Sequence, residues 1–111
     1  MSSTEATVNT AEDNNRIHVR SAVEAARNYL RQVLDQLVDP GNPIQGLRLE
    51  ETELSENRKH WLITLGFDRP VGNHLDPLQA VLANKRYERD YRIFKIDAET
   101  GEVQSMKIRE L

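Results

Sequence analysis

Apolar residues between positions 21 and 38 recur at intervals of three and four, with charged and amide side chains between them. This spacing places the apolar positions on one stripe of an α-helix. The stripe consists of Val23, Ala26, Leu30, Val33, Leu34 and Leu37. Ser21 and Glu24 match the capping-box pattern of a helix start, and two prolines and a glycine in residues 39–43 end the helix. The pattern predicts an amphipathic helix that needs an apolar surface to lie on.

The following segments alternate with a period of two, which is typical of β-strands with one buried face. Residues 47–54 form the first predicted strand, and a polar turn at 55–59 leads into the second. The second strand shows the clearest alternation in the chain. Its apolar face carries Trp61, Ile63, Leu65 and Phe67, and its other face carries His60, Thr64 and Gly66. Because a two-stranded hairpin alone is marginally stable in water, further strands are expected.

Two more strands are predicted near the C-terminus. Residues 91–97 are rich in β-forming side chains, and residues 102–109 follow a tight connection in which Gly101 supplies a positive φ. The third strand is apolar on both faces, as is usual for a strand that is covered on both sides. The sequence therefore predicts an α+β domain in which one long N-terminal helix packs on a four-stranded antiparallel sheet.

One helix covers only one face of a sheet, so the second apolar face needs another cover. A short helical or irregular insertion between the two hairpins, within residues 68–86, is the first candidate. Asp76 and Pro77 suit a helix start, and Leu78 and Leu82 belong to a short apolar stripe. The second candidate is another copy of the protein, which would form a homodimer through the sheet face. The sequence leaves both explanations open.

The length of 111 residues indicates a single domain. Residues 1–16 hold few apolar side chains and are expected to form a disordered tail, which leaves residues 17–111 as the domain. The first residues lack the positive start and apolar stretch of an export signal, so we expect a cytoplasmic protein. No apolar run approaches the roughly 18 residues that span a membrane, so we expect no membrane contact.

The third and fourth strands meet at a distinctive turn. Its residues Asp97, Thr100, Gly101, Glu102 and Val103 match the turn "aspartate, small residue, x, threonine, glycine, glutamate, valine" that is common in the PepSY domain family. With this turn and this order of helix and hairpins, the chain resembles a PepSY domain over roughly residues 20–109. The resemblance implies a non-catalytic module of a kind linked to protease inhibition or peptide binding, and it implies no functional residues, because the matched positions form a turn.

The sequence offers little catalytic chemistry. It has no cysteine, which excludes disulfides, thiolate metal sites and cysteine nucleophiles. The histidines lack metal-ligand spacing; they are His18, His60 and His74. An acidic cluster surrounds the first hairpin and suits either a cation site or a charged strand edge that opposes pairing with another chain, and we favour the edge. Its members are Glu50, Glu51, Glu53 and Glu56. We therefore expect no enzyme activity, no cofactor and no metal.

Residues 85–92 interleave basic side chains with Tyr87 and Tyr91. Tyrosine and arginine commonly anchor protein interfaces, so this run favours a protein or peptide partner. The predicted partner-binding residues are Tyr87, Arg89, Tyr91, Arg92, Leu78 and Leu82. A ladder of cross-strand charge pairs is the structural alternative, because acidic residues stand in the same run. The net charge of −3 argues against a nucleic-acid partner.

The sequence thus predicts a non-enzymatic module that binds a protein or peptide, as an inhibitor or an accessory subunit. The alternative is a small-molecule-binding or weakly catalytic cone-shaped domain, as in cystatin-like or nuclear-transport-factor-like folds. A closed apolar cavity between helix and sheet would favour that alternative, and a filled core would favour the interaction module.

Overall fold

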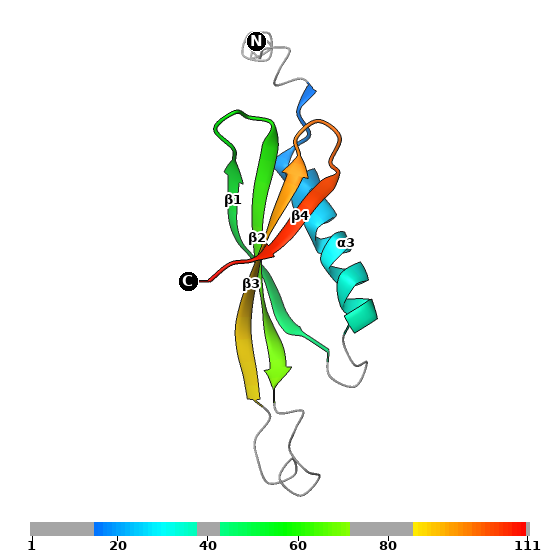
Figure 1. Cartoon of the computed structure of the whole chain (residues 1–111), viewed down its shortest axis with the longest axis vertical. Helices are drawn as coiled ribbons and strands as arrows, with labels where there is room; N and C mark the ends of the chain where they lie inside the picture. The colour runs from blue at the N-terminus through cyan, green and yellow to red at the C-terminus, as the bar shows by residue number, and fades with distance from the viewer. Residues whose placement is uncertain (1–14, 38–42, 72–85, 111) are drawn as a thin grey trace, which may run out of the picture.

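The computed structural model describes residues 15–37, 43–71 and 86–110. Within these residues the chain forms one long helix, α3 (Val19–Leu37), followed by four strands. The strands are β1 (Gln45–Leu54), β2 (His60–Val71), β3 (Arg86–Asp97) and β4 (Val103–Ile108). They pair antiparallel in the order β1-β2-β3-β4. Figure 1 shows α3 lying along one side of this sheet, so the predicted α+β fold class is confirmed.

The helix begins two residues earlier than the sequence indicates, and a different residue caps it. The backbone N–H of Arg20 donates to His18 Nδ1 at 3.1 Å, and the N–H of Ser21 donates to the His18 carbonyl at 2.9 Å. His18 therefore caps the helix in place of Ser21. Its ring nitrogen accepts a hydrogen bond from an N–H group of the first turn, as a serine hydroxyl would. The predicted capping box at Ser21 is wrong.

The segment before α3 is tied to both hairpins. The N–H of Ile17 donates to the Ala98 carbonyl at 2.6 Å, and the indole Nε1 of Trp61 donates to the Ile17 carbonyl at 3.1 Å. These bonds fix the N-terminal end of the helix over the turns of the sheet. Of the tail predicted over residues 1–16, only Asn15 and Arg16 belong to the described residues.

The core lies between α3 and the sheet. Leu65, Phe67 and Phe94 from the central strands are at most 1% exposed, and the ring of Tyr29 stands edge-on to that of Phe94 at 6.3 Å. The buried set comprises Ala22, Ala26, Leu30, Ile63, Leu65, Phe67, Phe94 and Ile96. The alternation predicted for β2 is confirmed. The buried stripe of the helix, however, also includes Ala22, which the sequence pattern did not select.

The central strands are longer than predicted. β3 begins at Arg86 rather than at residue 91, and β2 continues to Val71. Their pairing holds throughout, and it sets Arg69 opposite Glu88. The insertion expected over residues 68–86 therefore shrinks to 72–85, which lies outside the described residues together with Leu78, Leu82 and His74. Figure 1 shows β2 and β3 running past the end of α3, and we call this projecting part the β2–β3 arm.

The turn between β3 and β4 is organised by one carboxylate. Asp97 Oδ1 accepts from the N–H groups of Thr100 at 2.9 Å and Glu99 at 2.8 Å, and Gly101 takes the expected positive φ of 80°. The hydrogen bond from Thr100, followed by that from Glu99, lowers the pKa of Asp97 below its ordinary value of 3.8. The charged form of Asp97 therefore stabilises the folded turn.

Replacing Asp97 with asparagine is expected to remove an acid-sensitive part of the stability. Because folding lowers this pKa, the carboxylate stabilises the fold above pH 3.8 and loses that effect as the pH falls through the folded value. The difference in Tm between wild type and Asp97→Asn should therefore be largest near neutral pH and shrink in acid. Thermal scans across this range measure it, with the exposed helix variant Asp35→Asn as the control. A difference in Tm that is constant with pH would contradict the assignment.

Candidate interaction surface

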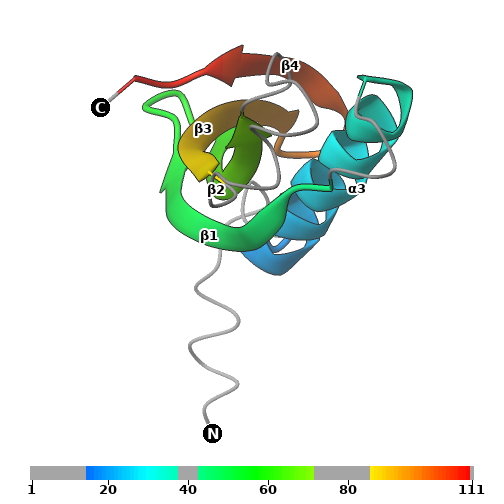
Figure 2. The same ribbon diagram turned by 90° about the horizontal axis from the view of Figure 1, so that it is seen from below.

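The sheet face opposite α3, here called the open face, carries the side chains that alternate with those of the core. The register of the strands assigns to it Arg48, Glu51, Glu53, Leu62, Thr64, Gly66, Asp68, Tyr87, Arg89, Tyr91, Ile93, Lys95, Ser105 and Lys107. Glu50, at the register shift in β1, and Arg109, just after β4, join this face through their contacts with Arg89 and Thr64. Figure 2 shows that the sheet curls, with β1 and β4 curving round the central strands. This curl lets Arg109 reach across the face, where its Nη1 donates to Thr64 Oγ1 at 3.0 Å and pairs with Glu51.

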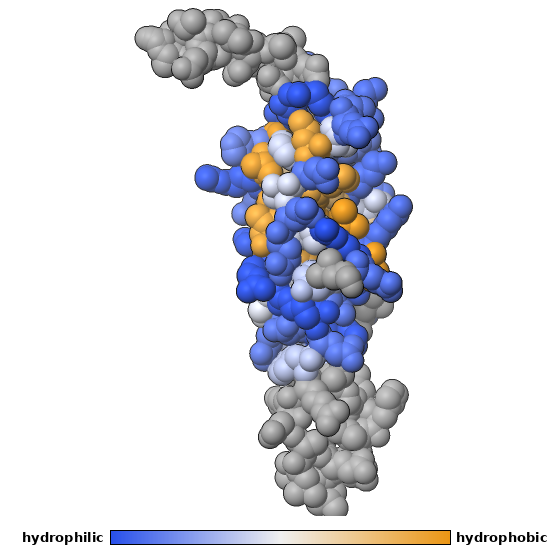
Figure 3. All heavy atoms as spheres, turned by 90° about the vertical axis from the view of Figure 1, so that its left-hand side faces the viewer, coloured by the Kyte–Doolittle hydropathy of each residue, from blue (hydrophilic) through white to orange (hydrophobic). Residues whose placement is uncertain are grey.

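The open face is mixed rather than apolar. Leu62 and Ile93 are partly buried, and Thr64 is 2% exposed beneath Arg109. Figure 3, which looks at the side away from α3, shows apolar patches separated by polar side chains, and the coloured surface below these patches is largely polar. The prediction of an apolar second face is therefore wrong. Apolar side chains of β3 form only part of this face, and ion pairs cover much of the rest.

Arg89 holds the centre of an ion-pair network on this face. Its Nη2 lies 2.6 Å from Glu50 Oε2, and its Nη1 lies 3.3 Å from Asp68 Oδ1 and donates to the Gly46 carbonyl at 2.8 Å. The Arg89 and Glu50 side chains are 23% and 24% exposed. The hydrogen bond between them lowers the pKa of Glu50 and raises that of Arg89. The guanidinium is therefore held in place by acceptors of the protein itself.

Gly66 makes room for this network. A side chain at this position of β2 would meet the Glu50 carboxylate and would come within 2.9 Å of Arg89 Nη2. The glycine thus lets the Arg89–Glu50 pair lie directly on the sheet. A β-bulge in β1 between Leu49 and Glu51 contributes as well, because an extra residue re-aims the side chains of a strand. Both Glu50 and Glu51 consequently contact arginines of the open face.

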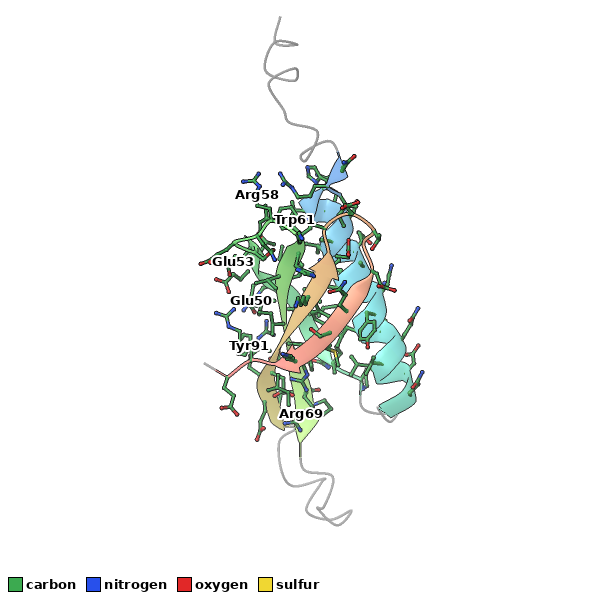
Figure 4. All side chains as sticks on the ribbon, turned by 45° about the horizontal axis from the view of Figure 1, so that its top comes forward. Glu50, Glu53, Arg58, Trp61, Arg69 and Tyr91 are labelled. Carbon is green, nitrogen blue, oxygen red and sulfur yellow. The ribbon has the colours of Figure 1, made fainter. Side chains whose placement is uncertain are left out.

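The two tyrosines flank Arg89 along β3. Tyr91 stands opposite Gly66, and its ring centroid lies 5.9 Å from the Arg89 guanidinium carbon. Tyr87 stands opposite Pro70 on the same face. Both tyrosines are partly buried. Figure 4 shows Tyr91 and Glu50 on the side of the sheet away from α3. Three of the predicted partner-binding residues, Tyr87, Arg89 and Tyr91, therefore share one surface.

Arg92 does not belong to that surface. It lies on the helix side of β3, where its guanidinium carbon is 5.4 Å from the Phe67 ring centroid and its Nη2 is 3.8 Å from Asp90. The alternation of the strand decides this placement, since Arg92 differs by an odd number of residues from Tyr87, Arg89 and Tyr91. The remaining predicted residues, Leu78 and Leu82, lie outside the described part of the chain.

The helix side of the β2–β3 arm carries a second network. Arg69 Nε donates to Asp90 Oδ2 at 2.6 Å, and Arg69 Nη2 lies 3.0 Å from Glu88 Oε2. Arg69 and Arg89 therefore each bind two carboxylates on opposite faces of the same pair of strands. The ladder of cross-strand charge pairs, the structural alternative for residues 85–92, is confirmed.

The acidic cluster of the first hairpin is divided by these contacts. Glu50 faces Arg89 and Arg48, whereas Glu51 faces Arg109. Within the described ranges, no group of three histidine or acidic side chains is arranged to hold a metal ion. The charged-edge interpretation agrees with this pairing, although the partners Arg89 and Arg109 are not evident from the sequence, because they lie 39 and 58 positions away in the chain.

The described histidines have structural partners. His18 caps α3, and His60 Nε2 lies 2.8 Å from Gln104 Oε1 on the neighbouring hairpin.

The fold and surface define a small α+β domain with a curled four-stranded sheet and one open face. Comparison with family models, curated proteins and solved structures gives no match for this chain. The resemblance to PepSY domains therefore stays a prediction. No helix in the described residues combines the length and apolar character needed to cross a membrane.

Proposed function

We propose that this protein is a non-enzymatic module that binds a peptide or protein partner on its open face. The proposal rests on one observation: Tyr87 and Tyr91 flank Arg89, which is held by Glu50 and Asp68. Tyrosine and arginine are the residue types that most often anchor interfaces. A guanidinium that is already ordered loses little conformational freedom on binding, so this arrangement lowers the entropic cost of association.

The partly buried apolar side chains of the same face support the proposal. Leu62 and Ile93 lie between charged residues, which gives a surface of mixed character. Interfaces of non-obligate complexes have this mixture, with apolar contacts at the centre and a polar rim. The proposed partner therefore offers an apolar side chain to the two tyrosines. It also offers a polar or acidic group to the cationic side chains of the open face. Roles as an inhibitor or as an accessory subunit both agree with such a surface.

The packing beneath the helix supports this function over the cone-shaped alternative. Ala26, Leu30 and Phe94 meet in the layer between α3 and the sheet, each at 0 or 1% exposure. Side chains thus occupy the space where a small-molecule domain of that type would hold its ligand.

Replacing Tyr91 with alanine is expected to weaken peptide binding about tenfold or more, because aromatic anchors commonly contribute over ~1.4 kcal/mol. The probe is a peptide selected from a displayed random library on the wild-type protein. Affinity is measured by fluorescence anisotropy, and Tm is measured in parallel. Light scattering of the free protein separates partner binding from self-association. A steep loss of Tm with unchanged affinity would contradict the proposal.

Arg69 provides a matched control for Arg89. Arg89→Gln and Arg69→Gln each remove one cation that binds two carboxylates, on opposite faces of the β2–β3 arm. If the open face binds the partner, Arg89→Gln weakens binding and Arg69→Gln does not, at similar thermal stability. Equal effects of the two variants on affinity would place binding elsewhere.

A further inference from the structure

The turns of the two hairpins and the segment before α3 surround a pocket of about 460 Å³. This pocket lies at the end of the sheet opposite the β2–β3 arm; Figure 4 shows Arg58 at this end and Arg69 at the other. Its volume falls within the roughly 300–1,000 Å³ of small-ligand sites. It is separate from the open-face surface proposed above, and it requires no protein partner.

Backbone hydrogen bonds fix the walls of the pocket. The N–H of Ala98 donates to the Lys59 carbonyl at 2.9 Å, which joins the two hairpin turns. The N–H of Ile17 donates to the Ala98 carbonyl at 2.6 Å, which adds the N-terminal segment. Three segments that are distant in sequence are thus held together, so the pocket does not have to form when a ligand arrives.

The lining is rich in cations. Arg16, Arg58 and Lys59 come from two of the three segments, and His60 stands beside them. The acidic members are Asp97 and Glu99. Asp97 is already engaged, because its Oδ1 accepts two backbone N–H groups of its own turn and its Oδ2 lies 3.4 Å from Gln104 Nε2. These hydrogen bonds hold Asp97 in its own turn without removing its charge, so the described lining carries three cationic side chains and two acidic ones.

Arg58 occupies an unusual backbone conformation. Its φ is +62°, a left-handed value at which glycine or asparagine is ordinarily found. The turn enforces this value, since the Arg58 N–H donates to the Ser55 carbonyl at 2.8 Å and Asn57 Oδ1 accepts from the Lys59 N–H at 3.0 Å. The left-handed turn thus places a cationic side chain at the pocket, at a position where glycine would relieve the backbone strain.

We propose that this pocket binds a small oxyanion, namely the phosphate or carboxylate group of a soluble ligand. Guanidinium and ammonium groups are the preferred partners of such oxyanions, through charge-assisted hydrogen bonds. The pocket volume leaves space for a ligand larger than the anionic group itself.

The test uses inorganic phosphate as the first probe and acetate as the second. Backbone amide shifts of the full chain are followed by NMR at neutral pH, with sodium chloride keeping the ionic strength constant. The expected result is a saturable shift at Lys59, His60 and Ala98. Saturation by phosphate alone, by acetate alone or by both identifies the oxyanion group. Shifts that do not saturate with either probe would overturn the proposal.

Arg58→Gly removes one cation from the pocket while relieving the left-handed strain, so the fold should be retained. It is expected to weaken anion binding roughly fivefold. Arg31→Gln, on the exposed side of α3, removes the same charge far from the pocket and should leave binding unchanged. Lys59→Gln provides a second variant at the pocket. Wild-type affinity in both Arg58→Gly and Lys59→Gln would show that the pocket is not the binding site.

Discussion

Replacing Phe94 with alanine is expected to lower the free energy of unfolding by about 3–5 kcal/mol. The Phe94 ring is fully buried on the central strand β3, and Tyr29 of α3 packs edge-on against it. Its removal leaves a cavity between the helix and the sheet, which the surrounding backbone cannot close without breaking strand pairing. Domains of this size are stable by ~5–15 kcal/mol, so this single change removes a large share of the total.

Urea unfolding followed by circular dichroism measures this loss. Phe94→Leu is the control, because it keeps most of the apolar volume and should cost about 1.5 kcal/mol or less. A loss below about 1 kcal/mol for Phe94→Ala would mean that the layer between α3 and the sheet is not closely packed.

Enlarging Ala26 to leucine is expected to cost about 1–3 kcal/mol by the opposite mechanism. Ala22 and Ala26 are both 0% exposed, so the helix backbone lies close to the sheet along this stripe. A leucine at position 26 has no free volume to enter and must displace the helix. The expected readout is a lower urea midpoint with a retained helical circular dichroism signal.

Ala25→Leu provides the comparison for this prediction. Ala25 is only partly buried, so the added side chain can extend toward solvent and should have a small effect on the urea midpoint. If both substitutions changed the midpoint equally, close approach of the helix at Ala26 would not explain the loss.

Local patterns predicted the elements whose side chains follow one period. The alternation of Trp61, Ile63, Leu65 and Phe67 located β2 and its buried face, because a strand that is buried on one side must alternate. The turn after Asp97 is equally local, since the backbone N–H groups that Asp97 accepts come from residues at most four positions away. Such features depend on neighbouring residues and need no knowledge of the rest of the chain.

The candidate site was predicted only in part. The residue types predict Tyr87, Arg89, Tyr91 and Arg92 as one group, and the first three do share a face. Strand alternation places Arg92 on the opposite side. The early start of β3 was missed because residues 86–90 carry charges, which weaken a strand pattern. Glu88, Arg89 and Asp90 pair with charged side chains of β2, so this part of β3 is stable in the sheet despite its polarity.

The helix, the alternating central strand and the glycine turn follow from the amino-acid pattern alone, since each depends on contacts between residues close in the chain. The cover of the second sheet face follows only from the assembled sheet. The Arg89–Glu50 pair joins residues 39 positions apart, and it requires the bulge in β1 and the missing side chain of Gly66. Strand register sets these relations, and register depends on the whole sheet forming together.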